Sequence, residues 1–294
     1  MSASAAASFG LAAGSALALN WSYFTQHQQT SKLPPLSVRR PLRSLALLVS
    51  DRRWLVGLAI GFVGWLLYVA ALSLGTLSLV QAASAGGIGI LAVLVWRLGG
   101  VRLSRREWAG VALALLGLVL LAISLARNGT NHPFTPHSSW PGVAAWMAAT
   151  GVLAAAFAGP LSRPLSGGAG LGVAAGLCYS AGDVGTKIAV GGGARLFFAA
   201  PVLAAHALGF VFLQLGFQRG GALATAGVAS LVTNAVPIAA GMILYGDALP
   251  SGALGAARLL SFAAVVAGAA LLTRGPDRPA AARPEPDRRA APSG

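Results

Sequence analysis

The sequence predicts an all-α membrane protein of about nine transmembrane helices, arranged as two inverted four-helix repeats joined by a linking helix. Three observations lead to this prediction: 56% of the residues are hydrophobic, only 10% are charged, and apolar runs recur along the chain. A chain of 294 residues with so little polar surface cannot cover a water-soluble globule. Its 39 glycines lack a period of three, which excludes a collagen-like protein.

Nine apolar runs approach the ~20 residues that cross a hydrocarbon core about 30 Å thick. They are Ala3–Phe24, Trp54–Leu74, Leu77–Trp96, Trp108–Leu125, Gly142–Ala158, Gly168–Val190, Leu196–Phe217, Gly221–Leu244 and Leu254–Leu272. No Lys or Arg precedes Lys32, so the first run lacks the basic region of a cleaved signal peptide. The stretch Leu45–Val49 is too short to cross, and arginines flank it, so we expect it to lie along the cytoplasmic interface.

The basic residues predict the orientation. When alternate loops are placed on one side, 17 of the 21 Lys and Arg residues fall on that side and only Arg127 and Arg195 on the other. The positive-inside rule then places the N-terminus outside and the C-terminus in the cytoplasm of an integral protein of the plasma (cell inner) membrane. Four tryptophans lie near predicted helix ends, where indole rings favour the interface. They are Trp54, Trp96, Trp108 and Trp140.

The net charge of +14 would suggest a nucleic-acid partner in a soluble protein. Here the basic residues lie between apolar runs and form no stripe interleaved with aromatic residues. We therefore expect no nucleic-acid partner and interpret the charge as a topology signal. One cysteine, Cys178, excludes an internal disulfide framework and a site made of several thiolates.

Short matching strings predict an internal repeat. The pair Gly10 and Gly14 in FGLAAG recurs as Gly172 and Gly176 in LGVAAG, and the segment that begins at Gly75 is echoed from Gly221 onward. The alternative is a chance resemblance between helices rich in Ala, Gly and Leu. Because one linking helix separates two four-helix repeats, the run 3–24 crosses from outside to inside and the run 168–190 from inside to outside. The two repeats are then inverted relative to one another, as in many transporters.

This repeat predicts one membrane domain over residues 1–273. It comprises repeat one at 3–126, a linking helix at 142–158 and repeat two at 168–273. Residues 274–294 are rich in Pro, Arg and Ala and contain no aromatic residue, so we expect a disordered cytoplasmic tail.

Four segments resemble the drug/metabolite transporter superfamily, in particular its EamA-like and NIPA-like nine-helix branch. They are GLAAGSALALNWSYFTQ, AALSLGTLSLVQ, REWAGVALALLGLVLL and AGLCYSAGDVGTKIA. The resemblance extends over about residues 3–273 and implies a transport protein with inverted halves around a central pathway. Because its motifs consist of common membrane residues, it implies the superfamily more than any substrate.

Asp183 and Lys187 are the most informative ionisable residues, since a charge inside the membrane costs about 2.5–3.5 kcal/mol on insertion scales. Their i, i+4 spacing places them on one helix face. Two interpretations are open: a self-neutralising structural pair, or a role in the substrate pathway or in proton coupling.

The run 221–244 holds the next candidates, Thr233 and Asn234, because Pro237 cannot donate to the carbonyl of Thr233 and predicts a helix break that lines a site. An ordinary kink is the alternative. Four further polar residues lie inside apolar runs and serve either as substrate contacts or as hydrogen bonds between helices. They are Asn20, Gln81, Tyr179 and His206. We expect Arg258 to have a structural role at the outer interface, with Asp247 as its partner.

These residues predict a secondary transporter that moves a small polar or amphipathic metabolite or drug by alternating access. The alternatives are a NIPA-like transporter of magnesium or another divalent cation, and a membrane interaction protein that transports nothing. We expect no enzyme activity, because no nucleophile–base pair or acidic dyad is found, and no cofactor or metal site. The expected partners are the substrate, membrane lipids and a second copy of the chain in a homodimer.

Overall fold

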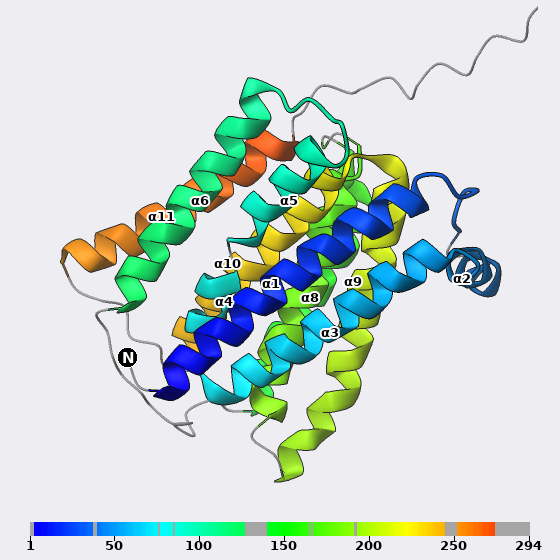
Figure 1. The fold of residues 1–294 in the computed structure, drawn as a ribbon. Helices are drawn as coiled ribbons and strands as arrows, with labels where there is room; N and C mark the ends of the chain where they lie inside the picture. The colour runs from blue at the N-terminus through cyan, green and yellow to red at the C-terminus, as the bar shows by residue number, and fades with distance from the viewer. Residues whose placement is uncertain are drawn as a thin grey trace, which may run out of the picture.

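The computed structural model describes residues 3–37, 40–75, 77–84, 86–126, 140–163, 165, 167–190, 193–244 and 252–273. Within these residues every regular element is a helix, which confirms the predicted all-helical class. The helices gather side by side in one bundle (Figure 1). The predicted tail at 274–294 and the loop around Arg127 lie outside the described residues.

Eleven α-helices are described among these residues. They are α1 (Ala3–Thr30), α2 (Pro41–Val49), α3 (Arg52–Leu74), α4 (Leu77–Ser84), α5 (Gly87–Arg97), α6 (Arg105–Ala126), α7 (Trp140–Ala158), α8 (Ala169–Ala189), α9 (Ala199–Arg219), α10 (Val228–Leu244) and α11 (Ala253–Thr273). A π-helical turn, η3 (Leu223–Gly227), leads directly into α10, and short 3₁₀ turns precede α8 and α9. Each predicted apolar run therefore coincides with helical structure.

Five helical segments have both the length and the apolar composition needed to cross a membrane. They are Arg52–Leu74, Trp140–Ala158, Arg195–Arg219, Leu223–Leu244 and Ala253–Leu272. Exposed Leu, Val and Phe side chains cover much of their outer surfaces, as expected where lipid is the solvent. These segments support the coarser prediction of a helical membrane protein with several spans.

The third predicted run is not one helix. It divides into α4 and α5, with Gly86 and Gly87 at the start of the second helix. A side chain at Gly87 would occupy the position of the Asn20 amide from α1, so only glycine allows this approach. Pro237 was predicted to break or kink its helix, but α10 continues through that residue without a break. The break therefore lies in the first half of the chain.

Helices pack mainly in antiparallel pairs: α1 with α3, α8 with α9, and α6 with α11. Gly57 of α3 faces Thr25 of α1, and the Ser8 hydroxyl, near the start of α1, donates to the carbonyl of Ala71 near the end of α3. Lys187, near the end of α8, bonds that same end of α3. Thus α1 and α8 run in opposite directions through the bundle (Figure 1).

Two predicted interfacial side chains are instead buried. Trp54 is only 1% exposed and its indole Nε1 donates to Oε1 of Gln214 at 3.2 Å, so the prediction of an interfacial ring is wrong here. Arg258 is also 1% exposed and donates to the hydroxyl and carbonyl of Ser124 on α6. The expectation that it reaches the outer interface is therefore wrong, and its expected partner Asp247 lies outside the described residues.

The short apolar stretch after Arg40 forms α2, which projects away from the bundle beside the start of α3. Its exposed side chains Leu42, Leu45 and Val49 share one face, and the Arg43 side chain is also exposed. This pattern agrees with a helix that lies along a membrane interface.

Candidate substrate cavity

A cavity of about 370 Å³ lies among α1, α3, α8, α9 and α10 and reaches the end of α4. Its volume lies in the range of small-molecule sites, roughly 300–1,000 Å³. The walls combine aromatic and aliphatic side chains with polar ones. The polar lining residues, tyrosines included, are Asn20, Ser22, Tyr23, Gln26, Tyr68, Ser84, Tyr179, Asp183, His206, Ser230, Thr233 and Asn234.

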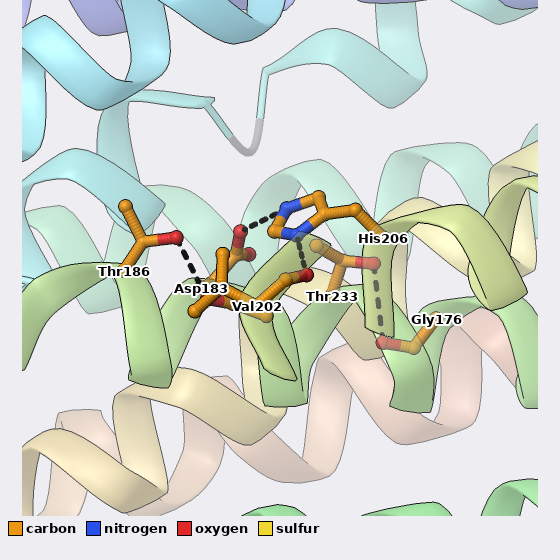
Figure 2. Close-up of polar contacts among 7 residues, drawn as sticks. Gly176, Asp183, Thr186, Val202, His206 and Thr233 are labelled. Atoms are coloured by element: carbon orange, nitrogen blue, oxygen red, sulfur yellow. Dashed lines mark hydrogen bonds and ion pairs between the residues drawn. The ribbon is translucent and has the colours of Figure 1, made fainter. Parts of the chain in front are cut away.

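Asp183 is the charged centre of this cavity. It is 3% exposed and its Oδ1 lies 3.5 Å from Nε2 of His206, which α9 contributes (Figure 2). The side chain of Tyr68 from α3 is hydrogen-bonded to the same carboxylate. Burying a carboxylate is costly unless such partners compensate the lost hydration. Side chains from α3 and α9 therefore surround the acidic group that α8 places inside an apolar bundle.

The second nitrogen of His206 bonds the backbone of its own helix. Its Nδ1 lies 2.9 Å from the carbonyl oxygen of Val202, one turn earlier on α9 (Figure 2). Because a carbonyl oxygen can only accept, Nδ1 is the donor in this contact. Nε2 is therefore the ring nitrogen that faces the Asp183 carboxylate.

Glycine on α8 makes room for this arrangement. A Cβ at Gly182 would overlap the imidazole of His206, so the ring fits against α8 only because residue 182 has no side chain. Trp65 and Tyr179 complete the surroundings, with ring centroids 5.7 Å and 5.9 Å from that of His206. The imidazole is thus enclosed by aromatic rings and aimed at the carboxylate.

Two asparagines present amide groups to the cavity from opposite halves of the chain. Asn20 of α1 donates from Nδ2 to the carbonyl of Ala16 at 2.8 Å, and Asn234 of α10 donates to the carbonyl of Ser230 at 2.7 Å. Each amide therefore bonds to the preceding turn of its own helix. The Oδ1 atom of Asn20 is buried and has no hydrogen-bond partner.

Six of the eight side chains predicted from the sequence line this cavity. They are Asn20, Tyr179, Asp183, His206, Thr233 and Asn234. The hydroxyl of Thr233 also donates to the carbonyl of Gly176 on α8 at 3.4 Å (Figure 2), so it connects α10 to α8. The side chain of Gln81 lies outside the described residues.

Lys187 bonds the backbone of a second helix. Its Nζ donates to the carbonyls of Leu72 at 2.9 Å and Gly75 at 2.5 Å, at the end of α3. Carbonyls at the end of a helix lack partners within the helix, and a cation there also interacts favourably with the helix dipole. Lys187 therefore joins α8 to α3 at the end of the bundle where α1 begins.

A polar cluster at the opposite end of the bundle was not predicted from the sequence. The Gln214 side chain on α9 is hydrogen-bonded to Gln26 and accepts bonds from Thr30 at 2.8 Å and from Trp54 at 3.2 Å. Gln26 also donates to Ser22 at 2.6 Å. The residues Ser22, Gln26 and Thr30 repeat every four positions, and this polar stripe on an otherwise apolar helix was the available signal.

The side chains around the cavity define what it can contact. Within the described residues, no group of three or more His, Cys, Asp and Glu side chains is placed to hold a metal ion. The described lining has one carboxylate, one imidazole, three amides and several aromatic side chains. Such a surface offers charged, polar and aromatic contacts to a small molecule.

A helical chain with several segments of spanning length is an integral membrane protein. It is 40% identical over 76 residues to a UPF0060 membrane protein of Cellvibrio japonicus (strain Ueda107), a match that covers 22% of this chain and 70% of that protein. Through this segment, the chain belongs to the family of UPF0060 membrane proteins. No family model and no solved structure matches the chain.

Proposed function

We propose that the chain is a secondary transporter of the drug/metabolite transporter type, and not an enzyme. It moves a small polar or amphipathic compound by alternating access through the cavity among α1, α3, α8, α9 and α10. The observation that carries this proposal is the buried Asp183 carboxylate, which faces a cavity of about 370 Å³ between the two halves of the chain. An ionisable group inside a membrane protein is a functional site by default.

The helix arrangement supports nine crossings with inverted halves. The first two helices of each half pair with each other, α1 with α3 and α8 with α9. The last helices of the halves, α6 and α11, pair together, and α4 packs on α10. Opposite directions for α1 and α8 are what an inverted repeat requires. In this proposal α7 is the linking helix, and the substrate site lies where the halves meet.

Each end of the cavity has contacts that can act as a gate. At one end, Lys187 of α8 bonds the carbonyls of Leu72 and Gly75. At the other end, Gln214 of α9 bonds Gln26 on α1. Both sets join the first half to the second, so alternating access would break one set while the other stays intact.

The Asp183–His206 pair supplies a route for proton coupling. Nδ1 of His206 donates to the carbonyl of Val202, so Nε2 is the ring nitrogen that faces Oδ1 of Asp183, 3.5 Å away (Figure 2). A proton bound between these two groups would neutralise the carboxylate, and its loss would leave a negative charge in the cavity that favours a bound cation. Substrate and proton would then compete for one site, which couples their movements.

A divalent-cation transporter is the weaker alternative. Mg²⁺ favours oxygen ligands and keeps several waters, usually with one or two carboxylates. Asp183 is the one carboxylate among the described lining residues, and the aromatic walls suit an organic molecule better.

A membrane interaction protein that transports nothing would not need a cavity that water can enter. Thiol labelling of Asp183→Cys and Asn234→Cys therefore separates the two classes, since a transporter exposes both positions to water.

The direct test is flux into proteoliposomes that contain the purified chain, with a panel of metabolites, organic cations and Mg²⁺, with and without a proton gradient. We expect proton-dependent movement of an organic compound and its loss in Asp183→Asn. Asp51→Asn is the matched control, because Asp51 lies outside the cavity and caps α3 by accepting from the Trp54 amide at 2.9 Å. Proton-driven flux that persists in a folded Asp183→Asn protein would remove this residue from the mechanism.

A further inference from the structure

Helices are joined to one another at both ends of the cavity. One turn beyond Asp183 on α8, Lys187 donates to the carbonyl of Leu72 on α3 at 2.9 Å. At the other end, the side chain of Gln214 on α9 is hydrogen-bonded to Gln26 of α1. In this arrangement, a compound that approaches along the axis of the bundle meets helices that are bonded across its path.

The side of the cavity between α3 and α9 is different. Three of the lining side chains are also exposed on the outside of the bundle, Phe62 of α3 and Leu203 and Ala207 of α9. Phe62 is 57% exposed and Leu203 is 56% exposed. Helix α3 packs mainly on α1 and α9 mainly on α8, so the two helices flank this side without forming a packed pair. Side chains that both line the cavity and face outward form the rim of a lateral opening.

This opening lies at the depth of the hydrocarbon layer. Its two helices belong to segments of spanning length, and Phe62 and Ala207 lie near the middle of Arg52–Leu74 and Arg195–Arg219. The neighbouring exposed side chains on the two helices are apolar. They are Val63, Leu66, Leu208 and Val211. Lipid is the solvent at this depth, so a compound that reaches the opening from outside the protein is dissolved in the bilayer.

We propose that the substrate is an amphipathic compound that enters the cavity from the bilayer, through the opening between α3 and α9. Its apolar part passes Phe62, Leu203 and Ala207, and its polar group reaches the Asp183 carboxylate inside. Apolar walls with a few polar groups suit a ligand of this kind. This inference rests on the proposed transport function, because it concerns the same cavity, and it narrows the substrates to compounds that partition into membranes.

The route is tested with the purified full chain in proteoliposomes and an apolar aryl diazirine, a probe that dissolves in the bilayer and forms covalent adducts on illumination. Mass spectrometry locates the adducts. We expect adducts on Tyr179 and Thr233, which line the cavity on the inner helices α8 and α10. Ile243 of α10 is 68% exposed and provides the reference for direct labelling from lipid.

A large side chain on the rim should obstruct the opening. We expect Ala207→Trp to lose most of the adducts on the inner residues and to keep those on Ile243. Ala204→Trp is the matched control, because Ala204 is exposed on the same helix but is not part of the cavity lining, so its inner adducts should persist. If Ala207→Trp does not fold, Leu203→Trp provides the same comparison. In the flux assay, Ala207→Trp should slow membrane-partitioning compounds, whereas Ala204→Trp should not.

Two outcomes would overturn the inference: no adducts on Tyr179 and Thr233, or inner adducts that are unchanged in a folded Ala207→Trp protein. Adduct formation requires no flux, so the two proposals can fail separately. Inner adducts that Ala207→Trp removes, in a protein that moves no compound, would retain the lateral opening and remove the transport proposal. Flux of polar compounds without inner adducts would retain transport and remove the route from the bilayer.

Discussion

Helices α1 and α8 begin the two predicted repeats and carry the same Gly-x-x-x-Gly spacing, yet their surroundings differ. In α8, 17 of 21 residues are buried, and this helix contacts α7, α9 and α10. In α1, Phe9, Leu17 and Trp21 are 46%, 56% and 44% exposed. Helix α8 is thus an inner helix enclosed by protein, whereas α1 has one face on the exterior.

The glycines show what this difference means. A Cβ at Gly172 or Gly176 would overlap carbonyl oxygens of Thr225 and Ala229, where η3 and α10 cross α8. A Cβ at Gly10 would meet nothing within 4 Å, and one at Gly14 only a leucine methyl at 3.8 Å. The same sequence motif is therefore a close helix contact in one repeat and an ordinary surface in the other. Small residues allow two helices to pack closely, but the close contact forms only where a second helix lies against them.

The largest expected effect concerns the directions of the two helices and is all-or-none. We predict that cysteines at Lys32→Cys, after α1, and Gly193→Cys, after α8, react with impermeant thiol reagents from opposite sides of the membrane. Both positions are exposed, and Cys178→Ser removes the native thiol. The 17-to-2 charge bias places residue 32 in the cytoplasm. Labelling of both from one side would contradict the inverted arrangement.

The next largest effect tests the glycines. We predict that Gly172→Ala and Gly176→Ala each lower stability by about 1–3 kcal/mol, because the added methyl group forces α10 away from α8. Gly10→Ala and Gly14→Ala should be neutral or stabilising by up to ~1 kcal/mol, since alanine favours helix and space is open. Melting temperatures in detergent measure both pairs. Equal losses in the two helices would show that their contacts are equivalent.

The smallest expected difference between the two helices concerns the end of α3, which both helices contact. Lys187→Met should cost about 1.5–3 kcal/mol, because a charged donor to two carbonyls is lost. Ser8→Ala removes one neutral hydrogen bond to the carbonyl of Ala71, at 2.9 Å, and should cost about 0.5–1.5 kcal/mol. Thermal unfolding of both variants and of the double mutant provides the comparison. A larger loss of stability for Ser8→Ala than for Lys187→Met would mean that α1 holds the end of α3 more strongly than α8 does.

Much of the candidate site could be predicted, because polar residues inside apolar runs are few and costly. Asp183, His206 and Asn20 were identified on that ground and line one cavity. Of the two interpretations left open at Pro237, the broken helix is wrong, since α10 continues through the proline. The division between α4 and α5 was missed, because the glycines there indicated close packing without showing which partner approaches.

Partners across the bundle could not be predicted from spacing along one helix. The i, i+4 spacing places Asp183 and Lys187 on one helix face, but it could not show that His206 of α9 lies beside Asp183 or that Lys187 bonds the end of α3. These contacts join residues far apart in the sequence, and helical periodicity reports only which residues share a face.

The sequence by itself determined that this protein lies in a membrane and that its chain is helical. Apolar runs of spanning length leave backbone groups no partner in lipid other than their own helix. Tertiary structure alone decided which faces meet: the burial of Arg258 and Trp54, the inner position of α8, and the approach of His206 over Gly182. In lipid, exposed and buried helix faces are both apolar, so hydropathy cannot distinguish them, and only the shapes of facing helices fix the packing.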